Sequence, residues 1–293
     1  NLYFFNCLLD GEQFICLNHE PLFLNGVLDQ GYWPDGLYTA PSDEALIYDI
    51  QTIKNLGFNM IRKHVKVETA RWYYHCDRLG MIVWQDMVNG GTYNAPFMTW
   101  LPALFPKFKL HTSDRIHPLF GRKNVHGREE FIRECKETVT ALKAFPCIST
   151  WVIFNEGWGQ FDSKKLTALF RELDDTRLID SASGWFDRRQ GDFKSEHNYF
   201  AKQFVTPSDR AFVISEYGGY TCQVKGHTCS GKTYGYKICS SQEEFQAAYH
   251  KLMSEEIDPL KEQGLCGAVY TQLSDIEDEI NGLITYDREV CKL

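Results

Sequence analysis

The sequence lacks several features that would each indicate a class of function. No run of 18 uninterrupted apolar residues occurs, so no segment is long enough to cross a bilayer as a helix, and we expect no membrane partner. The first ten residues have neither a basic start nor a long apolar core, so they do not form a signal peptide as they stand. Positive charge is also scarce. The formal net charge is −8, which argues against nucleic acid as a partner.

Cysteine is plentiful, yet its spacing matches no standard site. The ten cysteines include no C-x-x-C pair. A chain of this length does not need disulfides to be stable, so we expect free thiols and a cytoplasmic location, with a periplasmic or secreted location as alternatives. Cys222, Cys229 and Cys239 lie near His227 in the sequence, and a metal or disulfide cluster is the other interpretation of that group. We expect no metal ion and no cofactor.

Apolar runs alternate with helical patterns along most of the 293 residues. The helical patterns cover 42–56, 68–79, 128–145, 163–173 and 242–264. The strand-like runs lie at 23–28, 58–65, 81–84, 151–154, 178–182, 192–196, 211–215 and 265–271. This alternation predicts an α/β fold, and a count near eight favours a closed (β/α)₈ TIM barrel.

The pattern also divides the chain into parts. We assign residues 21–293 to the barrel and expect a long loop, rich in proline, glycine and aromatic residues, at 87–126. Residues 1–20 alternate apolar and polar positions, which predicts a short N-terminal β-hairpin. Residues 1–4 of this extension resemble the remnant of a protease-cleavable tag.

Two of the predicted strands run directly into a glutamate. The apolar run Trp151–Phe154 leads into Asn155-Glu156, and Ala211–Ser215 leads into Glu216. In a barrel, residues that follow the strands gather at one mouth, where the active site lies. A pair of carboxyl groups at one mouth is what glycoside hydrolysis requires.

The other predicted strand ends carry polar and aromatic side chains. Sugars are recognised by this mixture, because their hydroxyl groups need hydrogen-bonding partners and their ring faces pack on aromatic side chains. The candidate substrate-binding residues are Trp33, Arg62, His64, Trp84, Asp86, Asn155, Trp158, Trp185, His197, Tyr199 and Tyr270. The sequence therefore predicts a carbohydrate-binding mouth, with Glu156 and Glu216 as its candidate catalytic residues.

These runs resemble the catalytic domain of glycoside hydrolase family 2, the group of β-galactosidases, β-glucuronidases and β-mannosidases. The resemblance covers nearly the whole chain. It rests on Phe23–Val27, on Asn59–Arg62 followed by His64, on Trp151–Gly157 and on Ile214–Gly219.

The resemblance implies a role for several residues. Glu156 would be the general acid/base and Glu216 the nucleophile of a retaining mechanism. Asn155 would bond the sugar 2-hydroxyl, while Arg62 and Tyr199 would orient Glu216. The sugar site would be walled by Trp33, Trp84, Trp158, Trp185 and Tyr270, of which Tyr270 stands where the family commonly has tryptophan.

We therefore expect a retaining exo-β-glycosidase, with β-galactosidase as the default sugar assignment. The alternatives are a β-glucuronidase, a β-mannosidase and a non-catalytic carbohydrate-binding barrel. The Asn-x-Lys run with which β-glucuronidases read the sugar carboxylate is absent, which lowers the first alternative. Accessory β-sandwich domains are usual in the family and absent here, so we expect a catalytic fragment or a reduced member. Homo-oligomerisation is left open.

Overall fold

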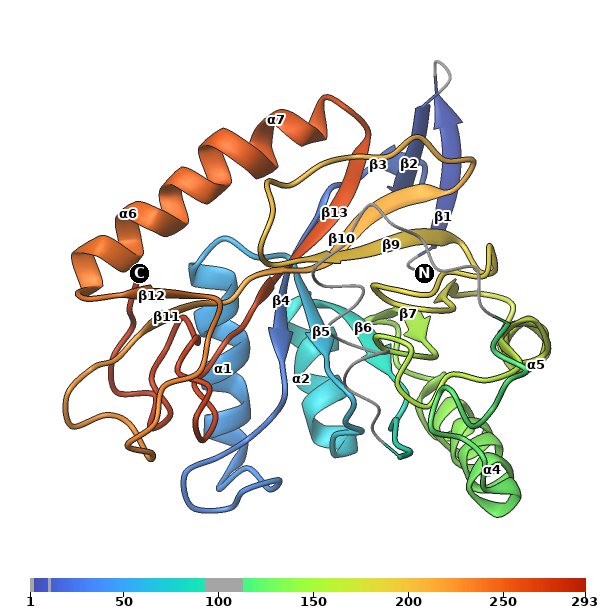
Figure 1. The fold of residues 1–293 in the computed structure, drawn as a ribbon, viewed down its shortest axis with the longest axis horizontal. Helices are drawn as coiled ribbons and strands as arrows, with labels where there is room; N and C mark the ends of the chain where they lie inside the picture. The colour runs from blue at the N-terminus through green and yellow to red at the C-terminus, as the bar shows by residue number, and fades with distance from the viewer. Residues whose placement is uncertain (1–2, 10–11, 93–112) are drawn as a thin grey trace.

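Eight parallel strands form the central sheet of the structure, a computed structural model that describes residues 3–9, 12–92 and 113–293 (Figure 1). In chain order they are β4 (Leu24–Asp29), β5 (Met60–Lys63), β6 (Ile82–Asp86), β7 (Ile148–Val152), β8 (Leu178–Asp180), β9 (Phe193–Asn198), β10 (Ala211–Gly218) and β13 (Leu265–Thr271). Their order across the sheet is β8-β7-β6-β5-β4-β13-β10-β9. The strands at the two ends, β8 and β9, lie side by side, and the side chain of Ser195 donates a hydrogen bond to Asp180 across that seam. The TIM barrel is therefore confirmed.

Helices cover the outside of the barrel (Figure 1). They are α1 (Asp43–Asn55), α2 (Ala70–Leu79), α4 (Val125–Leu142), α5 (Ser163–Leu173), α6 (Gln242–Leu252), the π-helical turn η2 (Met253–Ile257) and α7 (Asp258–Lys261). Ser42 caps the first helix, since its side chain accepts a hydrogen bond from the Ala45 amide. No described helix is both long and apolar enough to cross a membrane.

Two connections between strands depart from regular alternation. Residues 181–192 join β8 to β9, and residues 199–210 join β9 to β10; both segments are fully described and neither contains a helix. Within the predicted 87–126 loop, residues 93–112 lie outside the described residues, as do residues 1–2 of the tag-like segment. The absence of two helices leaves the loops after β8 and β9 free to build the mouth of the barrel.

A three-stranded antiparallel sheet precedes the barrel, made of β1 (Phe4–Leu9), β2 (Glu12–Leu17) and β3 (Glu20–Pro21). It contains the predicted hairpin and adds one short strand. Phe4 and Ile15 pack into the apolar interior at the start of the barrel strands, so Phe4 belongs to the folded structure. Cys7 and Cys16 form a disulfide between β1 and β2, so the expectation of ten free thiols is wrong for this pair.

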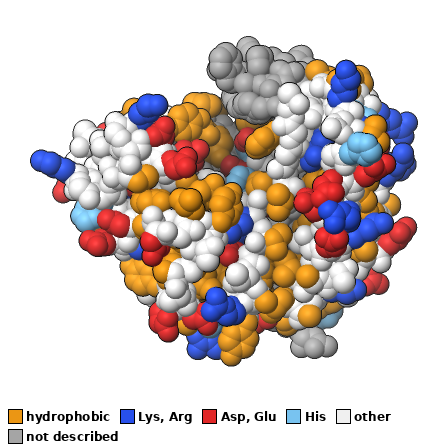
Figure 2. All heavy atoms as spheres, turned by 90° about the horizontal axis from the view of Figure 1, so that it is seen from below, with side chains coloured by type: hydrophobic (Ala, Val, Ile, Leu, Met, Phe, Trp, Pro, Cys, Tyr) orange, Lys and Arg blue, Asp and Glu red, His pale blue; other side chains and the backbone are white. Residues whose placement is uncertain are grey.

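The interior of the barrel has an apolar floor and a polar mouth. Inward-facing side chains near the strand starts are apolar, and they include Leu28, Met60, Trp84, Phe193 and Val213. One or two positions further along, the inward-facing side chains become charged or polar. Because every barrel strand runs the same way, these polar side chains collect at one end. Seen from that end, the molecule is hollowed, with acidic and histidine side chains around the hollow (Figure 2).

The loop between β11 (Tyr220–Cys222) and β12 (Lys237–Cys239) holds the cysteines considered above for a cluster. Cys222 and Cys239 are paired positions on these two strands and both are free thiols. His227 points elsewhere, with Nδ1 2.8 Å from Asp287 Oδ2. Residues 226–233 also match the sequence pattern G-x-x-x-x-G-K-[ST] of a phosphate-binding loop. In that motif the loop leads directly into a helix, and no helix directly follows residues 226–233.

Candidate active site

Glu216 lies near the end of β10, where the sheet is irregular between Ile214 and Glu216. The side chain is 6% exposed and accepts two hydrogen bonds. Arg62 Nη1 donates to Oε1 at 3.0 Å, and the Tyr199 hydroxyl donates to Oε2. A buried carboxylate with two such donors is stabilised as an anion and fixed in orientation.

Arg62, on β5, is fully buried and organises the floor of the site. Its Nε and Nη2 donate to the two carboxylate oxygens of Asp86 at 3.0 and 2.9 Å, and Nη2 also donates to Asn155 Oδ1 at 2.8 Å. Burial opposes the charge, but the carboxylates of Asp86 and Glu216 outweigh it and raise the pKa of Arg62. One guanidinium therefore connects strands β5, β6 and β10 with the loop after β7.

Glu156 follows β7 in a tight turn. It has φ 53°, and its amide donates to Ser183 O at 3.0 Å. Gly157 comes next with φ 69°, and a Cβ there would lie 2.3 Å from the Phe186 ring, so glycine is required. The Glu156 side chain is 25% exposed, and burial raises its pKa to about 7, with His64 and Arg62 opposing the rise. Glu156 therefore holds a proton near neutral pH.

His197, on β9, contacts Glu156 and links it to two serines. Its Nδ1 lies 2.8 Å from Glu156 Oε1 and its Nε2 lies 3.1 Å from Ser183 Oγ, which donates to Ser215 Oγ at 2.9 Å. Burial lowers the pKa of His197 to about 3, so the ring is neutral. Since the Ser183 hydroxyl donates its hydrogen bond to Ser215, Nε2–H donates to Ser183 and Nδ1 accepts a hydrogen bond from the protonated carboxyl group of Glu156.

The two glutamates lie close enough to act on one bond. One carboxylate oxygen of Glu156, one of Glu216 and one ring nitrogen of His197 lie within 4.8 Å of one another. Their surroundings differ, since Glu216 is bonded to Arg62 whereas Glu156 is desolvated without a bonded cation. Neighbouring carboxyl groups with opposite protonation states can divide proton transfer and nucleophilic attack between them.

His64 reaches the same mouth. Its Nδ1 lies 3.0 Å from Asp86 Oδ2. Burial works against its protonation, but the hydrogen bond to Asp86 and the charge of Glu216 raise its pKa above the ordinary value. The charge of His64 also opposes the rise in the pKa of Glu156.

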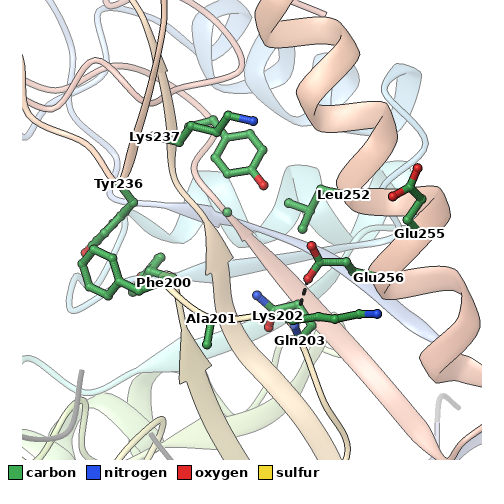
Figure 3. Close-up of a pocket in the computed structure, with 12 residues that line it drawn as sticks. Phe200, Ala201, Lys202, Gln203, Tyr236, Lys237, Leu252, Glu255 and Glu256 are labelled. Carbon is green, nitrogen blue, oxygen red and sulfur yellow. Dashed lines mark hydrogen bonds between the residues drawn. The ribbon is translucent and has the colours of Figure 1, made fainter. Parts of the chain in front are cut away.

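An aromatic stack borders the site on the β9 side. The rings of Tyr199 and Tyr236 are parallel, with centroids 3.8 Å apart and an interplanar angle of 7°, and Phe200 packs edge-on against Tyr236. Beside this stack lies a cavity of about 500 Å³, lined also by Lys202, Gln203, Leu252 and Glu256 among others (Figure 3). The hydroxyl that bonds the Glu216 carboxylate is thus held by a stacked ring.

Three of the predicted sugar-wall residues do not reach the mouth. Trp84 faces into the barrel, but it is 1% exposed and packs on Phe193 in the apolar floor. Tyr270 faces outward against Tyr249 of α6 and is fully buried, while its neighbour Thr271 faces inward toward Tyr199. Trp33 is buried in the outer core with the Arg288 guanidinium over its ring. Tyr270 departs from the expected wall because alternation along β13 turns it outward, whereas Trp84 lies too deep in the barrel and Trp33 lies in the outer core.

Two other predicted tryptophans lie near the mouth. The Trp185 indole donates to His197 O at 3.3 Å and its ring packs edge-on against the His197 ring. Trp158 is partly exposed in the turn after Glu156, and its indole donates to Gly91 O at 3.4 Å. Trp185 supports His197, while Trp158 presents a ring to the solvent side of the turn.

Four further polar residues of the site were not among the candidate substrate-binding residues. Gln30 follows β4, Gln272 follows β13, and Glu279 and Asn281 lie in the loop after β13. Gln272 Nε2 donates to Glu279 Oε2 at 3.0 Å and to Asn281 Oδ1 at 2.8 Å. Gln30 and Gln272 each directly follow a strand, which is a signal in the sequence, whereas the positions of Glu279 and Asn281 depend on how the loop returns to the mouth.

Two groups of side chains have the spacing of metal ligands among the described residues. One is Glu156, His197 and Glu216, and the other is His227, Asp287 and Glu289 near the surface. In the first group the carboxylates already have protein partners. In the second, Asp287 accepts hydrogen bonds from Thr285, His227 and the Glu289 amide. Hydrogen bonding within the protein accounts for both groups.

Comparison with known proteins gives the family. Residues 9–291 match the family model for the TIM barrel domain of glycosyl hydrolases family 2. A β-galactosidase from Priestia megaterium is 24% identical over 213 residues, which are 66% of this chain and 17% of that protein. A putative β-glucuronidase from Formosa agariphila is 25% identical over 174 residues, 57% of this chain and 14% of its own length.

Solved structures share the fold. A family 2 β-galacturonidase from Eisenbergiella tayi, bound to galacturonate, superimposes with a TM-score of 0.70 at 16% identity, covering 99% of this chain and 52% of that one. A Parabacteroides merdae β-glucuronidase gives 0.64 at 14% identity, covering 98% and 37%. The chain thus spans a fraction of each relative's length. The family match extends over almost all of it, and the chain belongs to glycosyl hydrolases family 2, as a TIM barrel domain of that family.

Proposed function

We propose that the chain is the catalytic domain of a retaining β-glycosidase that removes a terminal sugar by double displacement. The observation that carries the proposal is the pair Glu156 and Glu216, within 4.8 Å of each other and in opposite electrostatic surroundings. Retaining enzymes keep their two carboxyl groups about 5–5.5 Å apart, whereas inverting enzymes need about 6.5–9.5 Å to admit a water molecule. The separation supports the retaining mechanism.

The first step transfers the sugar to the protein. A Glu216 carboxylate oxygen bonds to the anomeric carbon as the bond to the leaving oxygen breaks, and Glu156 gives its proton to that oxygen. In the second step Glu156, now ionised, takes a proton from water. The water oxygen attacks the anomeric carbon and the bond to Glu216 breaks. A pKa of about 7 suits Glu156 to both roles.

The groups around Glu216 determine its orientation. Arg62 and Tyr199 each hold one carboxylate oxygen, so that the nucleophile is fixed in orientation before substrate arrives. Asn155, bonded through its oxygen to Arg62, has its amide nitrogen available for the sugar 2-hydroxyl. Such a hydrogen bond strengthens in the transition state of glycoside hydrolysis.

A neutral hexoside, with β-galactoside as the first choice, is the proposed sugar. Similarity to the Priestia β-galactosidase supports this choice. The chain is also similar to a putative β-glucuronidase and to a β-galacturonidase, and those names state the substrates of those proteins. The chain spans 17% of that β-galactosidase, so accessory β-sandwich domains in the whole protein are part of the proposal.

Nitrophenyl β-glycosides test the proposal. The wild-type chain should hydrolyse at least one of them with net retention, so that the first-formed hemiacetal seen by NMR is the β anomer. Glu156→Gln and Glu216→Gln should each abolish turnover. Azide should separate their roles, since Glu156→Ala should yield a β-glycosyl azide and Glu216→Ala an α-glycosyl azide. An α-hemiacetal as first product would exclude double displacement, and sugar binding with no turnover would favour the non-catalytic alternative.

A further inference from the structure

The sugar site contains a further carboxylate, Glu279, whose role follows from its surroundings. We propose that Glu279, held by Gln30 and Gln272, is a specificity-determining residue that admits neutral β-hexosides and rejects β-uronides. The inference rests on the proposed glycosidase function and deepens it by naming a substrate class.

The first support is where the fold places Glu279. Its carboxylate Oε2 accepts from Gln272 Nε2 at 3.0 Å and from Gln30 Nε2 at 3.4 Å, and these glutamines follow adjacent strands, β13 and β4. Thr271, next to Gln272, contacts the Tyr199 hydroxyl that bonds Glu216. A short run of contacts thus connects Glu279 to the nucleophile.

Electrostatics also place Glu279 beside the nucleophile. Burial raises its pKa, the charge of Glu216 adds to the rise, and the hydrogen bond from Gln272 and the charge of His64 oppose it. Glu279 therefore interacts with both a carboxylate and a histidine of the sugar site. The hydrogen bonds from the two glutamine donors oppose the rise in its pKa.

The second support is the free acceptor that Glu279 presents. Both of its hydrogen bonds go to Oε2, and Oε1 accepts none from the part of the chain that the structure describes. Oε1 is not among the buried polar atoms without a partner, so it is open to an incoming group. A carboxylate oxygen only accepts, and hence it matches a sugar hydroxyl and not a sugar carboxylate.

The third support is that the nearby cations are already occupied. Arg62 is bonded to Asp86, Asn155 and Glu216, and His64 to Asp86. Within the described ranges, no lysine or arginine forms an ion pair with Glu279. A uronide carboxylate entering this site would meet Glu279, and among the described residues no lysine or arginine of the site is free to offset it. Like-charge juxtaposition in an interface costs several kcal/mol, which corresponds to a discrimination of about 100-fold or more.

Matched substrate pairs test the proposal. The ratio of kcat/KM for 4-nitrophenyl β-galactoside to that for the β-galacturonide should be at least about 100 for the wild type, and the glucoside–glucuronide pair should behave alike. Glu279→Gln should reduce the ratio about tenfold or more, mainly through a lower KM for the uronide. Glu277→Gln, an exposed change of the same charge in the same loop, should leave the ratio unaltered.

The outcomes separate this inference from the proposed function. A wild type that prefers the uronide, or a ratio that Glu279→Gln does not alter, overturns the role of Glu279 while the glycosidase stands. If the wild type hydrolyses no glycoside, the glycosidase proposal fails. The inference is then decided by calorimetric binding of D-galactose against D-galacturonate, with uronate binding to the wild type overturning it. Should Glu279→Gln not fold, the wild-type ratio and Glu279→Asn give the same decision.

Discussion

Replacing Glu156 with glutamine should make the protein more stable at alkaline pH and leave its stability unchanged in acid. The carboxyl group is desolvated by the turn after β7, and the fold raises its pKa from 4.5 to about 7. Glutamine has nearly the same shape and no charge, so the variant removes the cost of burying the anion. The Glu156 carboxylate is thus predicted to lower the free energy of unfolding at alkaline pH.

The size of the effect follows from the shift in pKa. One pKa unit corresponds to about 1.4 kcal/mol, so a rise from 4.5 to about 7 amounts to about 3 kcal/mol. Below pH 4.5 Glu156 is protonated in both the folded and the unfolded chain, and it costs nothing. Between pH 4.5 and about 7 the carboxyl group is ionised in the unfolded chain and still protonated in the folded chain. The free energy of unfolding of the wild type therefore falls by about 3 kcal/mol over this range.

Urea unfolding at acidic and alkaline pH measures this directly. The free energy of unfolding of Glu156→Gln minus that of the wild type should be near zero in acid and about 3 kcal/mol above pH 7. The matched control is Glu216→Gln, which leaves Arg62 without one of its carboxylates and should lower stability by about 3 kcal/mol. A difference for Glu156→Gln that is the same at both pH values, or is destabilising above pH 7, refutes the reasoning.

Three further predictions follow from the geometry. The kcat/KM for an aryl β-glycoside should fall about tenfold per pH unit above about pH 7, because Glu156 must carry a proton; a plateau through that range would contradict its role as the acid. Tyr199→Phe removes the hydroxyl that bonds Glu216 and should lower kcat about 10- to 100-fold, so an unchanged kcat would show that the contact is dispensable. Reducing the Cys7–Cys16 disulfide frees a short loop of the unfolded chain and should lower the free energy of unfolding by about 2–3 kcal/mol; identical urea midpoints for both redox states would contradict this.

Most strands of the barrel were predictable from the sequence because they are short apolar runs that end in polar residues, whereas β9 (Phe193–Asn198) is largely polar. Arg62, Asp86, His197 and Tyr199 were predicted as strand-end residues and the structure brings them around Glu216. Such positions can be recognised in the sequence because burying a charged side chain is costly. A charged residue directly after a buried strand is therefore expected at the mouth of the barrel.

The rest of the site depends on features that a linear pattern does not contain. Whether Tyr270 or Thr271 faces the lumen is decided by one step of alternation, and the register irregularity before Glu216 alters that step on the next strand. Glu279 lies in a loop and reaches the sugar site because Gln272 and Gln30 hold it there. Hydrogen bonds between residues so far apart in the sequence can be identified only in the folded structure.

The sheet β1–β3 seals the barrel at the end opposite the catalytic mouth, with Phe4 and Ile15 inserted as its stopper. Because the β1–β3 sheet lies opposite the catalytic mouth, it is a suitable place to attach the domain to a support. Leu8 on β1 is 63% exposed, and a cysteine placed there could be coupled to a resin or an electrode. Cys229 and Cys291 are exposed free thiols, so both would be replaced by serine, and each attached domain would then face the solution with its sugar-binding end.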